Sequence, residues 1–423
     1  MRKWWPLLAV CAGSFLFLLD TTVVTVALPR IGADLRASVG QLQWVPNVYT
    51  LVLAVLMLAA GAVADRWGLR RVFLAGLAVF GLASLACGLA PDIGTLIAAR
   101  GVQAIGGSAL AVTGFAILAA SYEGRSLGTA ISVFFAVNGL GAAAGPVVGG
   151  VLTEYFGWPA VFFVNVPLAL ATGLFALRAV RPDEPGRPGR FDVAGAAWFA
   201  AGAASLVHGL TSDRWVLAVS VLGFTGFVVV ERRRAEPMLD LRLFRDGGFS
   251  TLIACAAAST STFAALVYVS LSLGLSRSPV AAGFALAPLA VASFLTSTLL
   301  GKVLHRFSPR TLLGTGVLVG ALGCLSLLVV AIPLGLAVTG IGVGIAGPAM
   351  GAAIASAAPP GRSGMAAGIL TTTRQFGQTL GVAVLGIAYQ TGGLAPVYVI
   401  AAACGAVTGL LALLPRKQAP VPA

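Results

Sequence analysis

The sequence has few charges and few of the side chains that build catalytic or metal sites. Charged residues make up 10% of the 423 positions, with 14 acidic residues and two histidines. Five cysteines stand singly in apolar stretches, without a C-x-x-C pair or a histidine partner, so the usual zinc and disulfide patterns are excluded. A Walker loop is missing, as is any cluster of His, Cys and carboxylates. We therefore predict neither an enzyme nor a metal-binding protein.

Long apolar segments dominate the chain instead. Hydrophobic residues make up 58% of it, and the mean hydropathy is +0.96, which excludes an ordinary soluble protein. A helix needs roughly 20 apolar residues to cross a bilayer. Nearly uncharged segments predict 14 transmembrane helices, at 4–28, 44–64, 72–91, 95–119, 126–152, 156–177, 193–211, 215–230, 248–274, 279–301, 311–330, 334–356, 364–389 and 395–414.

These helices form two groups of six around an inserted pair. We expect an N-terminal bundle over residues 1–180 and a C-terminal bundle over 248–415. Residues 181–247 hold a Pro-rich cytoplasmic linker, two extra helices at about 192–230 and an interfacial connector, and residues 416–423 form a tail. The segment 215–230 is the shortest, and the division of the uncharged stretch 311–361 is placed at Pro333.

The start of the chain has an alternative interpretation. Arg2 and Lys3 followed by apolar residues resemble a signal peptide. The apolar segment continues past Asp20 to Pro29 without a compelling cleavage site, so we interpret it as the first transmembrane helix.

The basic residues orient the helices. With the N-terminus in the cytoplasm, 21 Lys and Arg fall on cytoplasmic segments and four on outward loops, which matches the positive-inside rule. Both termini are therefore predicted to be cytoplasmic in a multi-pass cell-membrane protein. The same asymmetry accounts for the pI of about 10.4, so nucleic acid is not needed as a partner.

An internal repeat relates the two bundles. The segment Gly61 to Arg70 has a degenerate copy at Gly301 to Arg310, displaced by 240 positions, with glycine, arginine and an aromatic residue in register. Two like-oriented halves of this kind belong to transporters that move two bundles around a central site.

The segment Gly61 to Arg71 resembles the G-x-x-x-D-R-x-G-R-R signature of the major facilitator superfamily. The resemblance implies that fold and a latch that depends on conformation. In such a latch, glycines permit a tight turn and an aspartate meets a helix N-terminus or a basic partner; the alternative is a solvated loop. The latch residues are Gly61, Asp65, Arg66, Gly68, Arg70 and Arg71.

Two further segments resemble the antiporters of that superfamily, and in particular its 14-helix drug:proton antiporter branch. One is similar to the antiporter motif G-x-x-x-G-P-x-x-G-G and consists of Gly141, Gly145, Pro146, Gly149 and Gly150. The other, Leu19 to Pro29, resembles L-D-x-T-V-V-N-V-A-L-P with Thr25 in place of asparagine. Outside this context, small-xxx-small is ordinary helix packing.

The chain also departs from the family patterns. The helix 6 motif W-R-W-x-F-x-x-N-x-P appears from Trp158 to Pro167 without its arginine and second tryptophan, and His305 replaces the aspartate of the second latch.

Asp20 and Arg100 are the predicted proton-coupling residues. Of the 14 acidic residues only Asp20 lies well inside a predicted span, and a charge there costs at least roughly 2.5 to 3.5 kcal/mol. The alternative is a carboxylate that reaches the outer interface. Arg100 belongs to a segment similar to the family's R-x-x-Q-G-x-G motif, with Ala104 for its first glycine. Motion that changes the hydration of Asp20 or its distance from Arg100 changes its proton affinity.

The substrate cavity is predicted from polar and aromatic residues of the inner helices. For each of these residues, packing between helices is an equally good explanation. Arg374 binds an anionic group or pairs with backbone carbonyls and polar neighbours. The set is Trp44, Asn47, Tyr49, Phe135, Asn138, Phe263, Tyr268, Arg374, Gln375 and Gln378.

The resemblance implies a monomeric carrier that exchanges protons for a small hydrophobic or amphiphilic molecule and uses the proton gradient and no cofactor. Because the second half lacks visible acids, a neutral or singly charged cargo is favoured over a polyvalent cation. The alternatives are uptake or lipid translocation, and a receptor that binds ligand without moving it.

Overall fold

The computed structural model describes residues 2–182, 192–211, 215–234, 239–245, 247–266, 268–269, 272, 279–301, 306–357 and 363–414. Every regular element within these ranges is a helix, and each predicted transmembrane segment overlaps at least one. The predicted span 248–274 extends past the helix Gly247–Phe263, and residues 267, 270–271 and 273–274 lie outside the described residues. The linker residues 183–191 and the predicted tail 416–423 lie outside the described residues.

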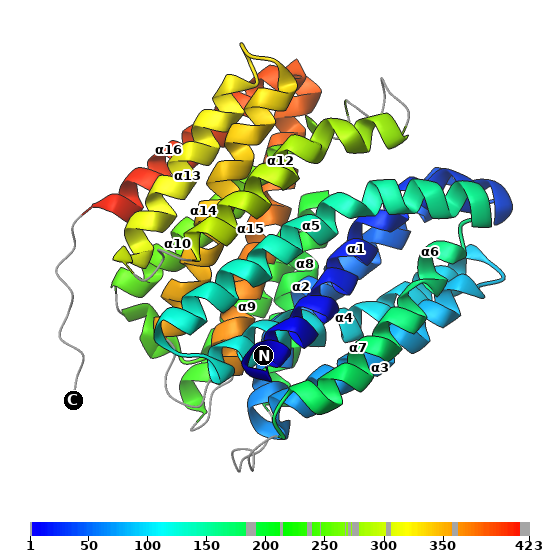
Figure 1. Cartoon of the computed structure of the whole chain (residues 1–423), viewed down its shortest axis with the longest axis horizontal. Coiled ribbons are helices and arrows are strands. Elements are labelled where there is room, and N and C mark those ends of the chain that lie inside the picture. Colours follow the sequence, from blue (N-terminus) through cyan, green and yellow to red (C-terminus); the bar gives the residue numbers. More distant parts are fainter. Residues whose placement is uncertain are drawn as a thin grey trace.

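The first bundle holds the helices up to residue 179 (Figure 1, blue to green). Its sixth predicted span is divided at Val164 into a short helix and a longer one. After the 3-10 turn Arg2–Trp4, its helices are α1 (Trp5–Asp34), α2 (Val39–Trp67), α3 (Leu69–Gly88), α4 (Ile93–Ser121), α5 (Gly124–Phe156), α6 (Ala160–Phe163) and α7 (Asn165–Ala179).

The inserted helices and the second bundle follow (Figure 1, green to red). The break that was placed at Pro333 falls just before it, because α13 ends at Ser326 and α14 begins at Ile332. The helices are α8 (Val193–Thr211) and α9 (Val216–Arg233), then, after the 3-10 turn Leu241–Arg245, α10 (Gly247–Phe263), α12 (Pro279–Leu300), α13 (Pro309–Ser326), α14 (Ile332–Ala357), α15 (Ser363–Gly392) and α16 (Leu394–Leu413).

The helices have the length and composition of membrane spans. Among the described residues, eight helices are long and apolar enough to cross a bilayer. The helix α5 is a ninth if its two segments, which are bent by 41° to each other, form one span. The bend lies between Gly124–Ala142 and Val147–Phe156, next to Pro146, which lacks the N–H of a helical hydrogen bond. Shorter apolar stretches occur in α8, α10 and α12. The chain is therefore a multi-pass membrane protein.

Polar side chains mark where several helices start. A capping box of Ser38 and Gln41 opens α2. Asp92 opens α4 by accepting a hydrogen bond from the backbone N–H of Thr95 at 2.9 Å. Hydrogen bonds from the backbone and hydroxyl of Thr95 lower the pKa of the Asp92 carboxyl.

The turns fall at two ends of the molecule. We call the end with the N-terminus and the α2–α3 turn at Gly68 the basic end, because Arg66, Arg70 and Arg71 lie beside this turn. At that end the Tyr122 hydroxyl donates to the Lys3 carbonyl at 2.9 Å and holds the start of the chain. The opposite end holds the α1–α2 turn at 35–38 and the α13–α14 turn at 327–331.

The buried side chains show that the bundles meet at the basic end. One cluster joins Phe115 and Ile131 of the first bundle to Met350 and Ile354 of the second. Towards the opposite end, the described residues form separate clusters, one within each bundle. The first contains Val24, Ile31, Ile93 and Trp158, and the second Tyr268, Leu327, Leu385 and Tyr398. The molecule is therefore closed at the basic end and divided towards the opposite end.

Glycines make the closed interface possible. A Cβ atom on Gly61 of α2 would lie 2.4 Å from the carbonyl oxygen of Gly364 in α15. In the second copy of the repeat, a Cβ atom on Gly301 would lie 2.9 Å from the Cβ of Ser132 in α5. Equivalent glycines thus bring each half against the other. Small residues at such contacts let helices approach closely in a membrane.

Replacing Gly61 with alanine is expected to separate the bundles at the basic end. An overpacked contact costs about 1–3 kcal/mol, which favours a separated arrangement by roughly 5- to 150-fold. Pulsed electron paramagnetic resonance between spin labels at Arg178 and Phe307, exposed positions of the two bundles at that end, measures the change as longer distances.

The matched control is Gly101→Ala. A Cβ atom on Gly101 would meet Val48 at 3.6 Å, an ordinary contact within one bundle. We expect its distance distribution to equal that of the wild type; an equally unchanged distribution in Gly61→Ala would contradict the role of this contact.

Candidate functional site

Asp20 lies near the middle of α1 and is completely buried. Its Oδ2 atom is 2.7 Å from Nη1 of Arg100 in α4, and the Arg100 side chain is only 1% exposed. The two residues predicted to couple protons therefore form a buried ion pair. A buried pair of this kind compensates two charges that would each be costly alone.

Two side-chain amides complete the hydrogen bonding of the carboxylate. The Nε2 atom of Gln103 donates to Asp20 Oδ1 at 2.9 Å, and the Nδ2 atom of Asn165 donates to the same oxygen at 2.7 Å. Gln103 also donates to the hydroxyl of Ser84 at 2.7 Å. Asp20 thus accepts three hydrogen bonds from α4 and α7 while buried in the first bundle.

Arg100 is held from several sides. Its Nη1 atom also donates to Oε1 of Gln103 at 2.6 Å, and its guanidinium carbon lies 4.0 Å from the centre of the Tyr49 ring. The ring provides a cation–π contact to this almost completely buried guanidinium. Tyr49, predicted to line the substrate cavity, therefore lies in the Asp20 network, because its ring packs beneath the guanidinium and only 1% of it is exposed.

Three members of the Asp20 network were given no role from the sequence. Gln103 and Asn165 stand in segments that resemble family motifs, so their positions carried a signal. Ser84 lies in an apolar stretch of α3 with no pattern around it. Its place beside Gln103 follows from how the helices turn towards each other, which hydropathy does not fix.

The antiporter-motif glycines pack directly against the segment of α1 that carries Asp20. Cβ atoms on Gly141, Gly145 and Gly149 would lie 3.1 Å from the Phe15 carbonyl oxygen, 1.8 Å from the Thr22 hydroxyl and 2.7 Å from the Val23 carbonyl oxygen. This face of α5 therefore fixes α1 on both sides of Asp20. Gly150 is also buried in α5, and the Pro146 side chain is outside the described residues.

The predicted latch connects the two bundles at the basic end. The carboxylate of Asp65 accepts hydrogen bonds from the backbone N–H groups of Gly364 at 2.7 Å and Met365 at 2.8 Å, in the first turn of α15. Those N–H groups have no partner within the helix, and the helix dipole favours a negative charge there. The helix N-terminus expected as a partner of Asp65 is thus present.

The other latch residues shape the turn. Gly68 has a φ of +99°, a backbone conformation that residues other than glycine rarely adopt. Arg70 donates to the carbonyl of Leu177 at the end of α7, Arg66 is half-buried and Arg71 is exposed.

Several cavity candidates lie on faces that look towards the other bundle. Trp44 and Asn47 are exposed and precede Gly61 and Asp65 on α2; Asn47 shares the face of Asp65, and Trp44 lies at the edge of that face. That face contacts α15 at the basic end and continues where the bundles have separate cores. On α15, Gln375 is half-buried and shares a face with Gly364, and Gln378 is exposed one turn further.

The remaining candidates are distributed differently. The Arg374 guanidinium carbon lies 5.2 Å from the ring centre of Phe135, across the two bundles. Asn138 accepts a hydrogen bond from Ser14 at 2.6 Å within the first bundle. Tyr268 donates to the Val382 carbonyl within the second. The Phe263 side chain is outside the described residues. Asn138 and Tyr268 thus hold neighbouring helices of one bundle together.

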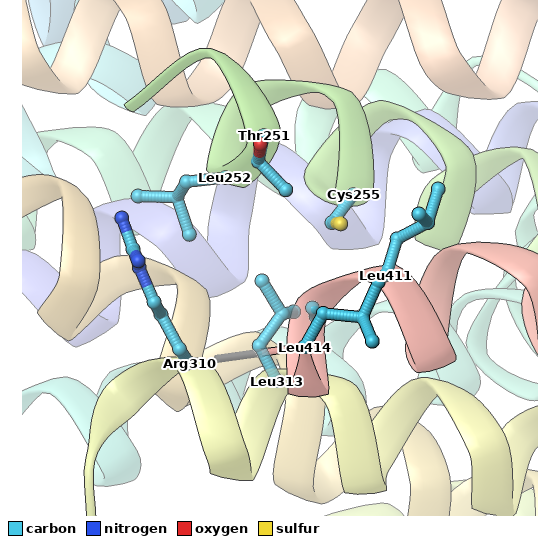
Figure 2. A pocket seen from close by; sticks show the side chains of 8 residues that line it. Thr251, Leu252, Cys255, Arg310, Leu313, Leu411 and Leu414 are labelled. Atoms are coloured by element: carbon cyan, nitrogen blue, oxygen red, sulfur yellow. The ribbon is translucent and has the colours of Figure 1, made fainter. Parts of the chain in front are cut away.

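A crevice at the basic end of the second bundle is separate from this site (Figure 2). It lies among α10, α13 and α16, and Arg310 is the one charged residue of its lining. The others are Thr251, Leu252, Cys255, Leu313, Leu411, Ala412 and Leu414. Since all of them belong to one bundle, the crevice does not join the two halves.

The sequence matches the family model of the Major Facilitator Superfamily over residues 10–233 and 248–423. It is 33% identical to the multidrug resistance protein Stp of Mycobacterium tuberculosis, over 90% of this chain and 74% of that protein. It is 34% identical to the tetracenomycin C resistance and export protein of Streptomyces glaucescens, over 91% and 76% of the two chains.

The fold is similar to that of solved transporters. The crystal structure of the human organic anion transporter MFSD10 superposes with a TM-score of 0.77 at 16% identity, covering 97% of this chain and 99% of that one.

Removing Arg100 is expected to destabilise the protein more than removing the pair. Arg100→Gln leaves Asp20 charged and uncompensated, which costs about 3–5 kcal/mol of unfolding free energy. Asp20→Asn combined with Arg100→Gln restores most of it. Denaturant unfolding in detergent micelles measures both, with Arg178→Gln on the exposed end of α7 as the control. Equal losses in the single and double variants would contradict the ion pair.

Alanine at Gly145 is expected to displace α1 and impair the Asp20 network. The added Cβ would meet Thr22 and lie 3.0 Å from the backbone nitrogen of Val23, so α1 has to shift. Gly139→Ala in the same helix meets only Ser293 at 3.6 Å and serves as the control. Since overpacking costs about 1–3 kcal/mol, the melting temperature in detergent should fall for Gly145→Ala alone; equal melting of both variants would contradict close α1–α5 packing.

Proposed function

The chain belongs to the major facilitator superfamily, and from this premise we propose that it is a proton-coupled antiporter that exports small hydrophobic or amphiphilic compounds. The observation that carries the proposal is the buried Asp20–Arg100 pair in the middle of the first bundle. A single ionisable carboxylate at membrane depth is what proton exchange requires.

The hydrogen bonds around Asp20 support a role in coupling. In the arrangement that is closed at the basic end, Asp20 is paired with Arg100 and accepts hydrogen bonds from Gln103 and Asn165. Protonation of Asp20 removes the charge that attracts Arg100 and weakens these bonds. Movement of α1 against α4 and α7 then changes the side from which water reaches the carboxyl group.

We propose that the latch and this network alternate. The Asp65 contact with α15 stabilises the arrangement that is open towards the opposite end. A proton taken up by Asp20 from that end, after cargo release, favours separation at the basic end. The proton leaves there as cargo binds. One embedded carboxylate suggests one proton per cycle, and one elementary charge crossing 100 mV supplies about 2.3 kcal/mol.

The direction of transport follows from the relatives and the charge distribution. Two relatives carry resistance or export in their names, which supports efflux here over uptake or lipid translocation. The bias of 21 basic residues to four supports cytoplasmic termini and a cytoplasmic basic end. We also propose that the carrier works as a monomer, without enzymatic activity and without a cofactor.

The cargo is proposed to bind between the bundles. Trp44 and Asn47 on α2 and Gln375 and Gln378 on α15 offer an aromatic surface and amide groups on faces turned towards each other. Phe135 and Arg374 close the space towards the basic end. Such a mixture of apolar and polar groups suits an amphiphilic molecule.

Replacing Asp20 with asparagine is expected to abolish gradient-driven transport. In inverted membrane vesicles with an acidic interior, accumulation of dyes and antibiotics should fall at least tenfold, because asparagine cannot carry the proton. Binding of the same compounds should remain. Asp34→Asn, at the exposed end of α1, is the matched carboxylate control and should transport normally.

Two outcomes would contradict the proposal in different ways. Undiminished proton-driven flux in Asp20→Asn at matched expression would remove Asp20 from coupling. The absence of flux in the wild type across a broad panel would contradict export of this class of compound, and flux measured in both directions separates export from uptake.

A further inference from the structure

Among the described residues, no carboxylate forms an ion pair with Arg374. It lies on α15 eleven positions beyond Ser363, roughly 16 Å along the helix at 1.5 Å per residue. Residues 248–423 contain no aspartate or glutamate, so its own bundle offers no carboxylate. Asp20, the acidic residue embedded in the first bundle, already accepts hydrogen bonds from Arg100, Gln103 and Asn165.

The hydrogen bonding of Arg374 is also incomplete. Its Nε atom is buried and has no hydrogen-bond partner among the described residues. The contact of its guanidinium is with the face of Phe135, which attracts the cation but accepts no conventional hydrogen bond. A guanidinium has five donors in a planar fork that matches the two oxygens of a carboxylate.

The position of Arg374 is suited to a ligand. The two preceding turns of α15 contribute Ala366, Ala367 and Leu370 to the core shared by the two bundles. Arg374 is half-buried at the edge of that core, and exposed Gln378 follows one turn further. The guanidinium thus lies where the closed interface ends and the space between the bundles begins.

We propose that Arg374 is the anion-binding residue of the cargo site, and that the cargo is an aromatic amphiphile with one ionised group, a carboxylate or an acidic phenol or enol. The anionic oxygens pair with the guanidinium, and the aromatic body lies against Phe135 and towards Trp44. This inference rests on the proposed export function and specifies its substrate class.

Exchange of this cargo has a defined charge balance. Each cycle brings one proton in and takes one anion out, so two elementary charges move in the same electrical sense. The membrane potential therefore drives the exchange in addition to the pH gradient, whereas export of a neutral molecule for one proton moves one charge.

A matched pair of dyes tests the proposal. 7-(Diethylamino)coumarin-3-carboxylate and its ethyl ester share a fluorophore and differ by one negative charge. Binding of each to the purified protein in nanodiscs is measured by fluorescence anisotropy. We expect the wild type to bind the acid at least tenfold more tightly than the ester, and Arg374→Gln to bind the two equally. Arg374→Lys should keep part of the preference.

The controls separate charge recognition from folding. Arg178→Gln removes an equal charge from an exposed position and should keep the preference. Equal binding of acid and ester by the wild type, no binding of the acid, or an unchanged preference in Arg374→Gln would each overturn the inference. A preference for the acid that is kept in part by Arg374→Lys but lost in Arg374→Gln distinguishes charge recognition from a structural role of the arginine.

Flux distinguishes this inference from the proposed function. Proton-driven export of the ester without preference for the acid would overturn the anion site and leave the exporter intact. Binding that depends on Arg374 without proton-driven flux of either dye would contradict proton-coupled export and leave the anion site intact.

Discussion

A charged carboxylate in the middle of a membrane protein needs a counter-charge and complete hydrogen bonding, and the Asp20–Arg100 pair meets both needs. Much of the first bundle is arranged around it. The helices α4 and α7 supply the donors, α2 supplies the Tyr49 ring, and the glycines of α5 pack on both sides of Asp20. Any change in the protonation of Asp20 therefore acts on four neighbouring helices at once.

The second bundle is built on a different principle. It contains no acidic residue, and it approaches the first bundle closely at two glycines, Gly364 against the backbone of Gly61 and Gly301 against the side chain of Ser132. The carboxylate of Asp65 comes from the first bundle and meets main-chain N–H groups of the second. One bundle thus holds the embedded carboxylate, and the other offers a backbone dipole and the inner cation Arg374.

Hydropathy and insertion cost were sufficient to predict where the helices lie and that Asp20 needs a partner. They follow from the energy of moving each residue into lipid, which depends on composition. The rotation of each helix does not. Most of these helices are apolar all round, so nothing in the sequence showed that Tyr49 turns towards Arg100, or that Asn138 and Tyr268 bind within a bundle. Ser84 was missed for the same reason.

The inserted helices α8 and α9 have a consequence for the motion itself. Phe199 of α8 and Phe224 of α9 pack on Phe376 of α15, and the same cluster includes Leu58 and Ala62 of α2. The pair α8 and α9 therefore covers the α2–α15 side of the interface. The α5–α12 side is related to this side by the repeat, but in the described chain it has no inserted helices. Separation of the two bundles at the basic end has to break or shift these aromatic contacts on the α2–α15 side. The rotation of one bundle against the other, which would be symmetric in two equal halves, is therefore expected to be asymmetric, with a larger displacement on the α5–α12 side.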